Sequence, residues 1–512
     1  MRFLTLLLTS AVVAVATFAE TRIDFPKVAP IQQSTDLQNW TDIGANDHVI
    51  APDLDYPIFY RQVEDNRPNI VFILTDDMRY DQYSAWGHPF IETPNIDRLA
   101  TEGINFQRAY VTTPLCGPSR SSIFTGRLPS RHGIRTHTND NLHAYEMPNG
   151  PFLLEEMQKA GYKTGFFGKW FNGRNFNGRV GADMWRGMGH AHKPSSIPWE
   201  GIEYWNWFVS VAYNHMFYYW PTGGWTQIHR YSTDVLRDLA VEFIHARNTR
   251  NEAPYFLFIS FLNPHSPYIP DSQFKGRYSD QGFQIPNYPN LQFNQANSND
   301  YVRQCEMLLS VDEAVRQILD EIGENTIVVF TSDNGFAHGE HGWAGKNHPM
   351  EESVGVPLFW YDPGHVIPRS NHDVVGLVDL YQTFLDLAGA DTPEDPYRYS
   401  KSILPTVYEG KPHRDELIVL HYNASNFNRI NFAQIITPDF TYWQFANGSN
   451  SLYSYDDPYQ LVNLVNEPAF SDVKSDLIER LDNELAHEGA NIMGNNPMPI
   501  WERDPTTQLV AP

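Results

Sequence analysis

The segment from Thr113 to Arg127 places one of the chain's two cysteines in an unusual setting. Cys116 lies between prolines, and the motif Cys-Gly-Pro-Ser-Arg120 opens a serine-rich run. An isolated cysteine is most often a buried core thiol. A cysteine that begins a run able to cap a helix is better placed for chemistry than for packing. This segment is therefore the first candidate for a reactive site.

Carboxylates follow two apolar runs that have the length of buried strands. Asp76 and Asp77 come directly after the first run, and Asp333 and Asn334 come after a run much later in the chain. Open α/β sheets place their ligands at the carboxyl ends of such strands. Adjacent buried aspartates repel each other, and a hard cation such as Ca²⁺ or Mg²⁺ relieves that repulsion. The spacing indicates a shared cation site, with simple capping of the following turns as the alternative.

Positive charge gathers near the cysteine, although the 512-residue chain has a net charge of −24. From Cys116 to Lys193 there are 11 Lys and Arg residues against 5 Asp and Glu. Such a local excess suits an anionic substrate group, and a solvated charged surface is the alternative. The acidic balance of the whole chain argues against nucleic acid as a partner.

His265 lies between two prolines after another apolar run. It is a candidate acid or base, with a structural role as the alternative.

Apolar runs alternate with amphipathic helices through most of the chain before residue 405, which predicts a doubly wound, mainly parallel α/β sheet flanked by helices. The expected strands are 69–74, 104–111, 162–168, 255–262, 326–331 and 356–361, and the expected helices are 94–103, 152–161, 231–247, 301–322 and 379–389. After residue 405, short runs at 418–422, 432–436, 441–445 and 451–455 and a helix at 471–487 predict a smaller α+β subdomain with an antiparallel sheet.

The start of the chain has the pattern of a targeting segment. Arg2 precedes a short apolar run that ends in small residues, which is typical of a signal peptide over residues 1–19. A buried strand or helix is the alternative. No later stretch has the pattern of a membrane span, so we expect a secreted or periplasmic protein. The remaining divisions are an N-terminal lead-in at 20–66, a catalytic domain at 67–404 and a C-terminal subdomain at 405–512.

The region 174–231 is rich in glycine and aromatic residues and does not fit a regular αβ unit. Aromatic side chains have apolar faces on which sugar rings can stack. We expect most of them to be ordinary packing, and a few Trp and Tyr residues within 199–225 to line a sugar-binding surface.

Taken together, these motifs resemble the type I sulfatases of the alkaline phosphatase superfamily. Cys116-Gly-Pro-Ser-Arg120, followed by Thr125-Gly-Arg127, matches the family's C-x-P-S-R signature and its extension. The other landmarks occur in order: Thr75-Asp-Asp77, Gly168-Lys169, His265 and Ser332-Asp-Asn-Gly335. The resemblance is strong over about residues 68–390 and loose beyond them.

The resemblance implies a sulfatase in which Cys116 is not used as a thiol. A formylglycine-generating maturation enzyme would oxidise it to formylglycine, whose hydrated aldehyde is the nucleophile. Ca²⁺ would be held by Asp76, Asp77, Asp333 and Asn334 and would also touch residue 116. Arg120 would orient the hydrate, and Lys169, His265 and Lys346 would bind the sulfate. His265 is our choice for the acid that protonates the leaving alcohol.

One position departs from the common family pattern. Many members have a histidine two residues after Lys169, where this chain has Phe171 followed by Asn172. This form resembles the glucosamine-6-sulfatase-like branch and leaves the base for sulfate release from formylglycine open. His132 is a candidate, and a structural hydrogen bond behind the cysteine segment is its alternative.

The expected substrate is a sulfated carbohydrate, either a polysaccharide or its oligosaccharides. Two other functions stay open: a phosphonate or phosphate ester hydrolase with the same signature, and a non-catalytic protein that binds sulfated glycans.

Overall fold

The computed structural model describes residues 65–136, 150–169, 230–249, 253–281, 299–422 and 430–490 in full. For the strands between residues 6 and 62 and between 184 and 228, and for Arg250 and residues 295–298 of two helices, it describes the backbone course only.

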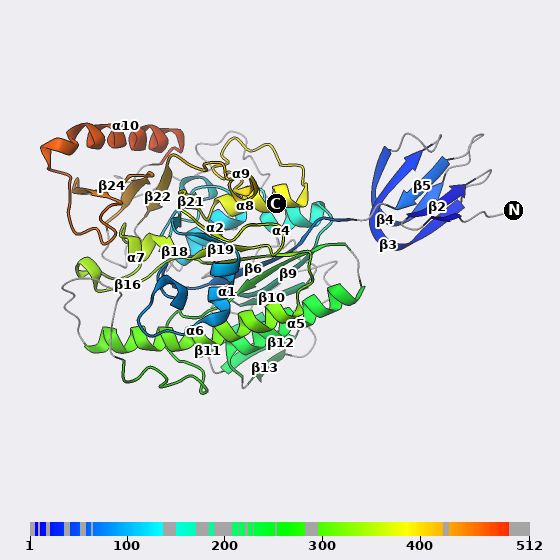
Figure 1. Cartoon of the computed structure of the whole chain (residues 1–512), viewed down its shortest axis with the longest axis horizontal. Helices are drawn as coiled ribbons and strands as arrows, with labels where there is room; N and C mark the ends of the chain where they lie inside the picture. The colour runs from blue at the N-terminus through cyan, green and yellow to red at the C-terminus, as the bar shows by residue number, and fades with distance from the viewer. Residues whose placement is uncertain are drawn as a thin grey trace.

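A mixed sheet forms the centre of the molecule, with strand order β13-β12-β11-β10-β9-β14-β6-β15-β19-β7-β20 (Figure 1). Its inner strands β10, β9, β14, β6 and β15 are parallel, and β19 is antiparallel to β15. The strands are β6 (Asn69–Thr75), β7 (Ile104–Phe106), β9 (Lys163–Lys169), β10 (Met184–Met188), β11 (Trp207–Ala212), β12 (His215–Trp220), β13 (Gly224–Ile228), β14 (Tyr255–Ser260), β15 (Thr326–Ser332), β19 (Leu358–Tyr361) and β20 (Arg369–Asn371).

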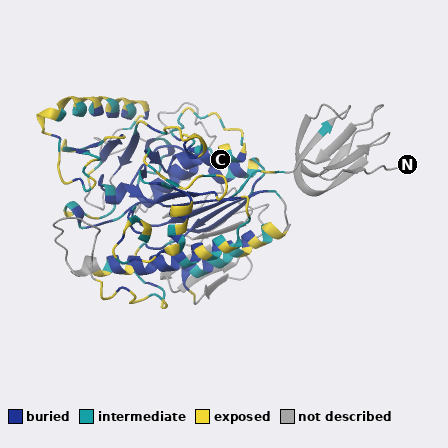
Figure 2. Ribbon diagram, viewed as in Figure 1, coloured by how far each residue is buried: buried dark blue, intermediate teal, exposed yellow. Residues whose placement is uncertain are grey.

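Helices cover both faces of this sheet, because its inner strands are apolar on both sides. Ile70, Phe72 and Leu74 of β6 pack into one core cluster, and Val71 and Ile73 pack into the other. The first cluster includes residues of α2 (Cys116–Thr125), α4 (Leu153–Lys159) and α8 (Asp379–Ala388), and the second includes residues of α1 (Pro94–Glu102), α5 (Ser232–Arg250) and α6 (Gln295–Glu321). Figure 2 shows the central strands as buried. The predicted doubly wound architecture is confirmed.

The single strand predicted at 104–111 is wrong. The chain forms β7, which pairs with β19 and β20, and then β8 (Ala109–Tyr110), which pairs with β18 (Gly355–Val356) and β21 (Val375–Gly376) in a separate small sheet. The Gln107 N–H donates to the Asn371 carbonyl (2.8 Å) where the chain leaves the main sheet. A continuous apolar run indicates burial and does not show where a strand changes partners.

Short elements connect these parts of the described chain. They are α3 (Pro129–His132), α7 (Glu351–Val354), α9 (Leu404–Glu409), β16 (Ala337–His338), β17 (Ala344–Gly345) and the 3₁₀ turns η1 (Ser84–Trp86), η2 (Glu340–Gly342) and η3 (Pro468–Phe470).

The C-terminal part contains the predicted antiparallel sheet, with strands in the order β22 (Leu417–His421), β23 (Phe432–Ile436), β24 (Phe440–Phe445) and β25 (Asn450–Ser454). The helix α10 (Ser471–His487) packs on this sheet through Leu477 and Leu481. One end of β22 is tied to the segment before Cys116, because the Leu420 N–H donates to the Thr112 carbonyl (2.8 Å). The predicted small α+β part is confirmed, and it lies against the cysteine segment.

The first 62 residues contain β1 (Leu6–Leu8), β2 (Ala11–Ala16), β3 (Thr21–Ser34), β4 (Thr41–Ala51) and β5 (Ile58–Gln62), which form a separate antiparallel sheet in the order β1-β2-β5-β3-β4, drawn in blue in Figure 1. The segments expected as signal peptide and lead-in both contribute strands to it, and their boundaries stay predictions. Among the described residues, no helix has both the length and the hydropathy needed to cross a bilayer.

Candidate active site

The two predicted acidic segments meet at the carboxyl edge of the sheet. Strands β6 and β15 are parallel neighbours, with Thr75 opposite Ser332, so the residues that follow them emerge side by side. Asp76, Asp77, Asp333 and Asn334 are all buried. The Asp77 N–H donates to Asp333 Oδ1 (3.3 Å), and Asn334 Nδ2 donates to Asp77 Oδ1 (2.6 Å).

This acidic cluster has the donor set of a hard cation site. Carboxylate oxygens of Asp76, Asp77 and Asp333 lie within 4.8 Å of one another. Asp76 Oδ1 and Asn334 Oδ1 are buried without a hydrogen-bond partner. Burial and the neighbouring Asp76 raise the pKa of Asp333, although Arg120 opposes this shift. Unpartnered buried oxygens are costly unless a cation meets them, so the residues present fit Ca²⁺.

Cys116 is the first residue of α2 and is fully buried beside this cluster. Lys346 Nζ lies 2.8 Å from Cys116 Sγ and 2.6 Å from Asp77 Oδ1. Ligand atoms of Asp76, Cys116 and His265 also lie within 4.8 Å of one another. Pro118 in the first turn and Gly126, whose φ of 68° ends the helix, fix the ends of α2. The sequence thus brings the residue 116 side chain to a helix start, next to an ammonium group.

Arg120 lies one helical turn after Cys116 and joins α2 to three strands. Its Nε donates to Asp333 Oδ2 (2.7 Å), and its Nη1 donates to the Lys169 carbonyl (2.7 Å) and to Ser260 Oγ (2.6 Å). Nη2 is buried without a hydrogen-bond partner. Burial alone would lower the pKa of Arg120, but Asp333 and Asp76 outweigh it and raise that pKa. Arg120 is therefore a fixed cation with one donor group still available.

Lys169 and His265 complete the charged group. Lys169 Nζ donates to Asp76 Oδ2. His265 Nδ1 donates to the Ser266 carbonyl (2.6 Å), and its Nε2 lies 3.8 Å from Asp77 Oδ2. Burial would lower the pKa of His265, but Asp76 and Asp77 raise it more. The imidazole thus stays protonated to higher pH than an isolated histidine.

The three carboxylates of the group are matched in number by arginine and lysine side chains, before the charge of a protonated His265 is counted. Asp76, Asp77 and Asp333 are matched by Arg120, Lys169 and Lys346. A divalent cation among the carboxylates would leave the group with a net positive charge. Such a site attracts an anion into a protein that is acidic overall.

His132 lies behind α2 and contacts the middle of that helix. Its Nε2 is 3.1 Å from Ser122 Oγ, and its Nδ1 accepts the Ile134 N–H (3.1 Å). Burial, followed by the charges of Arg127 and Arg135, lowers the pKa of His132 to about 3. Ser122 is six residues beyond Cys116, which is about 9 Å along a helix. These contacts favour the structural alternative for His132.

Two site residues were missed by reasoning from the sequence. Ser260 holds Arg120, and Asn263 accepts the Asp76 N–H through its carbonyl (3.1 Å). Ser260 ends β14 and Asn263 directly follows the strand predicted at 255–262, so the position of Asn263 at the carboxyl edge was a usable signal. Phe171, Asn172 and the side chains of 199–225 lie outside the fully described residues, and the hypotheses about them stay predictions.

Two protein-family models match this chain. The model described as "Sulfatase" matches residues 68–390, and that described as "N-sulphoglucosamine sulphohydrolase, C-terminal" matches residues 339–487. The chain belongs to the sulfatase family. It is a sulfuric ester hydrolase, and the expectation from the signature is confirmed.

Individual relatives agree with this assignment and with the predicted branch. N-acetylgalactosamine-6-sulfatase of Rattus norvegicus is 31% identical over 406 residues, which cover 72% of this chain and 70% of the relative. N-acetylglucosamine-6-O-sulfatase of Bacteroides thetaiotaomicron is 26% identical over 512 residues, covering 82% and 86%. A solved structure described as a complex with its substrate D-glucosamine-2-N,6-O-disulfate has a TM-score of 0.68 at 23% identity, covering 83% of this chain and 98% of that one. That structure shares the fold.

Proposed function

We propose that this sulfatase removes sulfate ester groups from a sulfated carbohydrate. The observation that carries the proposal is the meeting of Cys116, Lys346 and the buried carboxylates of Asp76, Asp77 and Asp333 in one cluster. The relatives named above act on sulfated amino sugars by their names, which supports a carbohydrate substrate.

Two groups would complete the site. Formylglycine, made from Cys116 by a maturation enzyme, would supply a nucleophilic hydroxyl as its hydrate, and Ca²⁺, held by Asp76, Asp77, Asp333 and Asn334, would supply positive charge beside the sulfate. The buried oxygens of Asp76 and Asn334 that have no partner support this cation.

The chain's own cations would bind and orient the reactants. Lys169 and Lys346 now pair with Asp76 and Asp77. With those carboxylates neutralised, both ammonium groups are available to the sulfate oxygens. Arg120 is held in place by Asp333 and Ser260, so its unpartnered Nη2 can orient the side chain of residue 116.

His265 is the proposed general acid. Its Nδ1–H is held by the Ser266 carbonyl, so Nε2 is the nitrogen that would protonate the leaving sugar oxygen. We propose that His132 positions α2 rather than acting as a base, since both of its ring nitrogens have partners in that region.

We also propose that the protein is exported through the leader-like residues 1–19, as their pattern predicts. The amino terminus of the mature protein, read by mass spectrometry, tests this directly.

The main test is an assay of sulfate release from a panel of defined sulfated oligosaccharides, with the protein expressed beside a maturation enzyme. We expect sulfate release together with formylglycine in the peptide that contains residue 116. Faster cleavage of an aryl phosphate than of the matched aryl sulfate would favour the phosphonate or phosphate ester hydrolase. Glycan binding without turnover of any ester would favour the non-catalytic alternative.

A further inference from the structure

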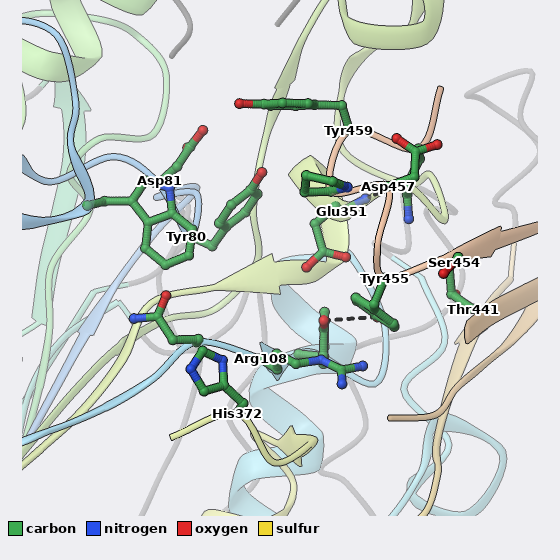
Figure 3. A pocket seen from close by; sticks show the side chains of 15 residues that line it. Tyr80, Asp81, Arg108, Glu351, His372, Thr441, Ser454, Tyr455, Asp457 and Tyr459 are labelled. Atoms are coloured by element: carbon green, nitrogen blue, oxygen red, sulfur yellow. Dashed lines mark hydrogen bonds between the residues drawn. The ribbon is translucent and has the colours of Figure 1, made fainter. Parts of the chain in front are cut away.

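A cavity of about 260 Å³ lies between the loop after β6 and the C-terminal sheet (Figure 3). Tyr80 and Trp86 line it from one side, and Tyr455 and Tyr459 line it from the other. In Figure 3 the carboxyl group of Glu351 lies in the middle of the labelled side chains. The volume of the cavity is just below the roughly 300 Å³ at which pockets for small molecules begin, so the cavity suits a single ring-sized group.

This cavity is separate from the cluster around Cys116. None of its lining residues belongs to that cluster. The C-terminal sheet touches the segment before Cys116 at Leu420 of β22. Following the paired residues across the four strands from Leu420 leads to Asn450 of β25. Tyr455 is five residues further along, which is about 16 Å at the usual rise of a strand. Along the strands, Tyr455 is thus offset from the point where the C-terminal sheet touches the segment before Cys116.

The cavity offers acceptors and aromatic faces, and both terminal nitrogens of its arginine are engaged. Arg108 Nη1 and Nη2 donate to the Pro438 and Thr437 carbonyls (both 2.5 Å), and its guanidinium lies 3.6 Å from the centre of the Tyr455 ring. In the fully described part of the chain, no ion-pair partner for the Glu351 carboxyl is found. Burial raises the pKa of Glu351 to about 7, although the charge of Arg108 and a hydrogen bond with the Tyr110 side chain oppose this shift. The lining carries three carboxyl groups, those of Asp81, Glu351 and Asp457, against the cation of Arg108 and the imidazole of His372, so it offers more acceptors for hydroxyl or amino groups than cations for a sulfate.

Aromatic rings and a carboxyl acceptor in one small cavity are the chemistry that recognises a sugar ring. Tyr80 and Trp86 form an edge-to-face pair with ring centres 5.3 Å apart, so one wall is rigid. The Tyr110 hydroxyl donates to the Tyr455 hydroxyl (2.9 Å), which fixes the opposite wall. The walls belong to the main domain and to the C-terminal sheet, so an occupant would contact both.

We propose that this cavity binds an unsulfated sugar residue of a carbohydrate chain, away from the residue whose sulfate is removed. The inference rests on the proposed function for the role of that chain, but the binding itself does not require catalysis. Its effect would be to hold a polymeric substrate on the enzyme between cleavage events.

The test measures binding of unsulfated hexasaccharides of chondroitin, agarose and chitosan by titration calorimetry and ligand-observed NMR. At least one should bind the wild-type protein, and Tyr459→Ala should weaken that binding about tenfold or more. Glu351→Gln, which keeps the shape of the side chain, should weaken it less. Leu461→Ala is the matched control, because Leu461 is 49% exposed in the same loop and does not line the cavity.

Thermal unfolding of each variant shows whether it is folded, and turnover of 4-nitrocatechol sulfate should stay at the wild-type level in all three. The proposal is overturned if no hexasaccharide binds, or if folded Tyr459→Ala and Glu351→Gln proteins bind as the wild type does. A wild-type protein that binds a hexasaccharide at this cavity but hydrolyses no sulfate ester would instead overturn the proposed function alone.

Discussion

Two buried charged clusters in this molecule, one built on three aspartates and the other on the single carboxylate of Asp379, differ in how fully their carboxylate oxygens are paired. In the first, at the edge of the main sheet, Asp76 Oδ1 and Asn334 Oδ1 have no partner, and the pKa of Asp333 is raised. In the second, at the start of α8, Asp379 Oδ1 accepts from the Lys401 N–H (2.8 Å) and from Arg414 Nη2.

The second oxygen of Asp379 is also fully used. It accepts from the Gly376 N–H (3.0 Å), from His413 Nε2 (2.9 Å) and from Arg414 Nε (2.8 Å). Burial would raise the pKa of Asp379, but Arg414 and His413 lower it well below its usual range. A carboxylate with every oxygen paired stabilises the fold, whereas one with unpaired oxygens is open to a ligand.

The largest expected effect comes from the cysteine of the unpaired cluster. Cys116→Ala should lower the rate of sulfate release by roughly 10⁴-fold or more, as loss of a nucleophile commonly does. The control is Cys305→Ala, since Cys305 is a core thiol of α6 whose pKa is raised by burial to about 12. If Cys116→Ala kept appreciable activity, the unpaired cluster would not be the reaction site. The measurement is sulfate release by ion chromatography.

Replacement of the proposed general acid sharpens the assignment of roles within the unpaired cluster. His265→Gln should lower kcat on a sugar sulfate by about 10²–10⁴-fold, because an alkoxide is a poor leaving group without a proton. On 4-nitrophenyl sulfate, whose leaving group is weakly basic, the loss should be much smaller. An equal loss on both substrates would exclude the role of acid and indicate that His265 binds the sulfate.

The next experiment compares the two clusters directly. Asp333→Asn should lower the rate of sulfate release by about 10²–10³-fold. It should also remove the increase in thermal stability that we expect Ca²⁺ to give the wild type. Asp379→Asn should keep the response to Ca²⁺ but lose about 3–5 kcal/mol of unfolding free energy, since Arg414 is left buried without its partner. Thermal scans with chelator and with added Ca²⁺ check both results. The reverse pattern would contradict the distinction between the clusters.

The smallest effect is the dependence of stability on pH at the paired cluster. The folded-state pKa of Asp379 is below the usual value of about 3.9, so its contribution is complete above that pH and is lost as pH falls below it. The difference in unfolding free energy between the wild type and Asp379→Asn should therefore shrink from pH 7 to pH 3. Urea titrations at the two pH values measure it, and a constant difference would show that Asp379 stabilises the fold through packing.

Much of the fold and most of the candidate site could be predicted from the sequence. The apolar runs at 69–74 and 326–331 are β6 and β15, and the acidic residues after them do meet. The run at 104–111 was divided between two sheets, because strand partners depend on neighbours that are distant in sequence. The pairing of Asp379 was not predicted from the sequence for the same reason, because its partners His413 and Arg414 follow 34 and 35 residues later.

By itself, the sequence determined the family, the alternating architecture and the residues that could react, because motif spacing and apolar periodicity are local properties of the chain. Only the tertiary structure decided which buried carboxylates are paired, that Ser260 holds Arg120 and that both ring nitrogens of His132 are engaged behind α2. The physical reason is that pairing and desolvation depend on which donors the fold brings within hydrogen-bond distance, and these donors come from segments far apart in the chain.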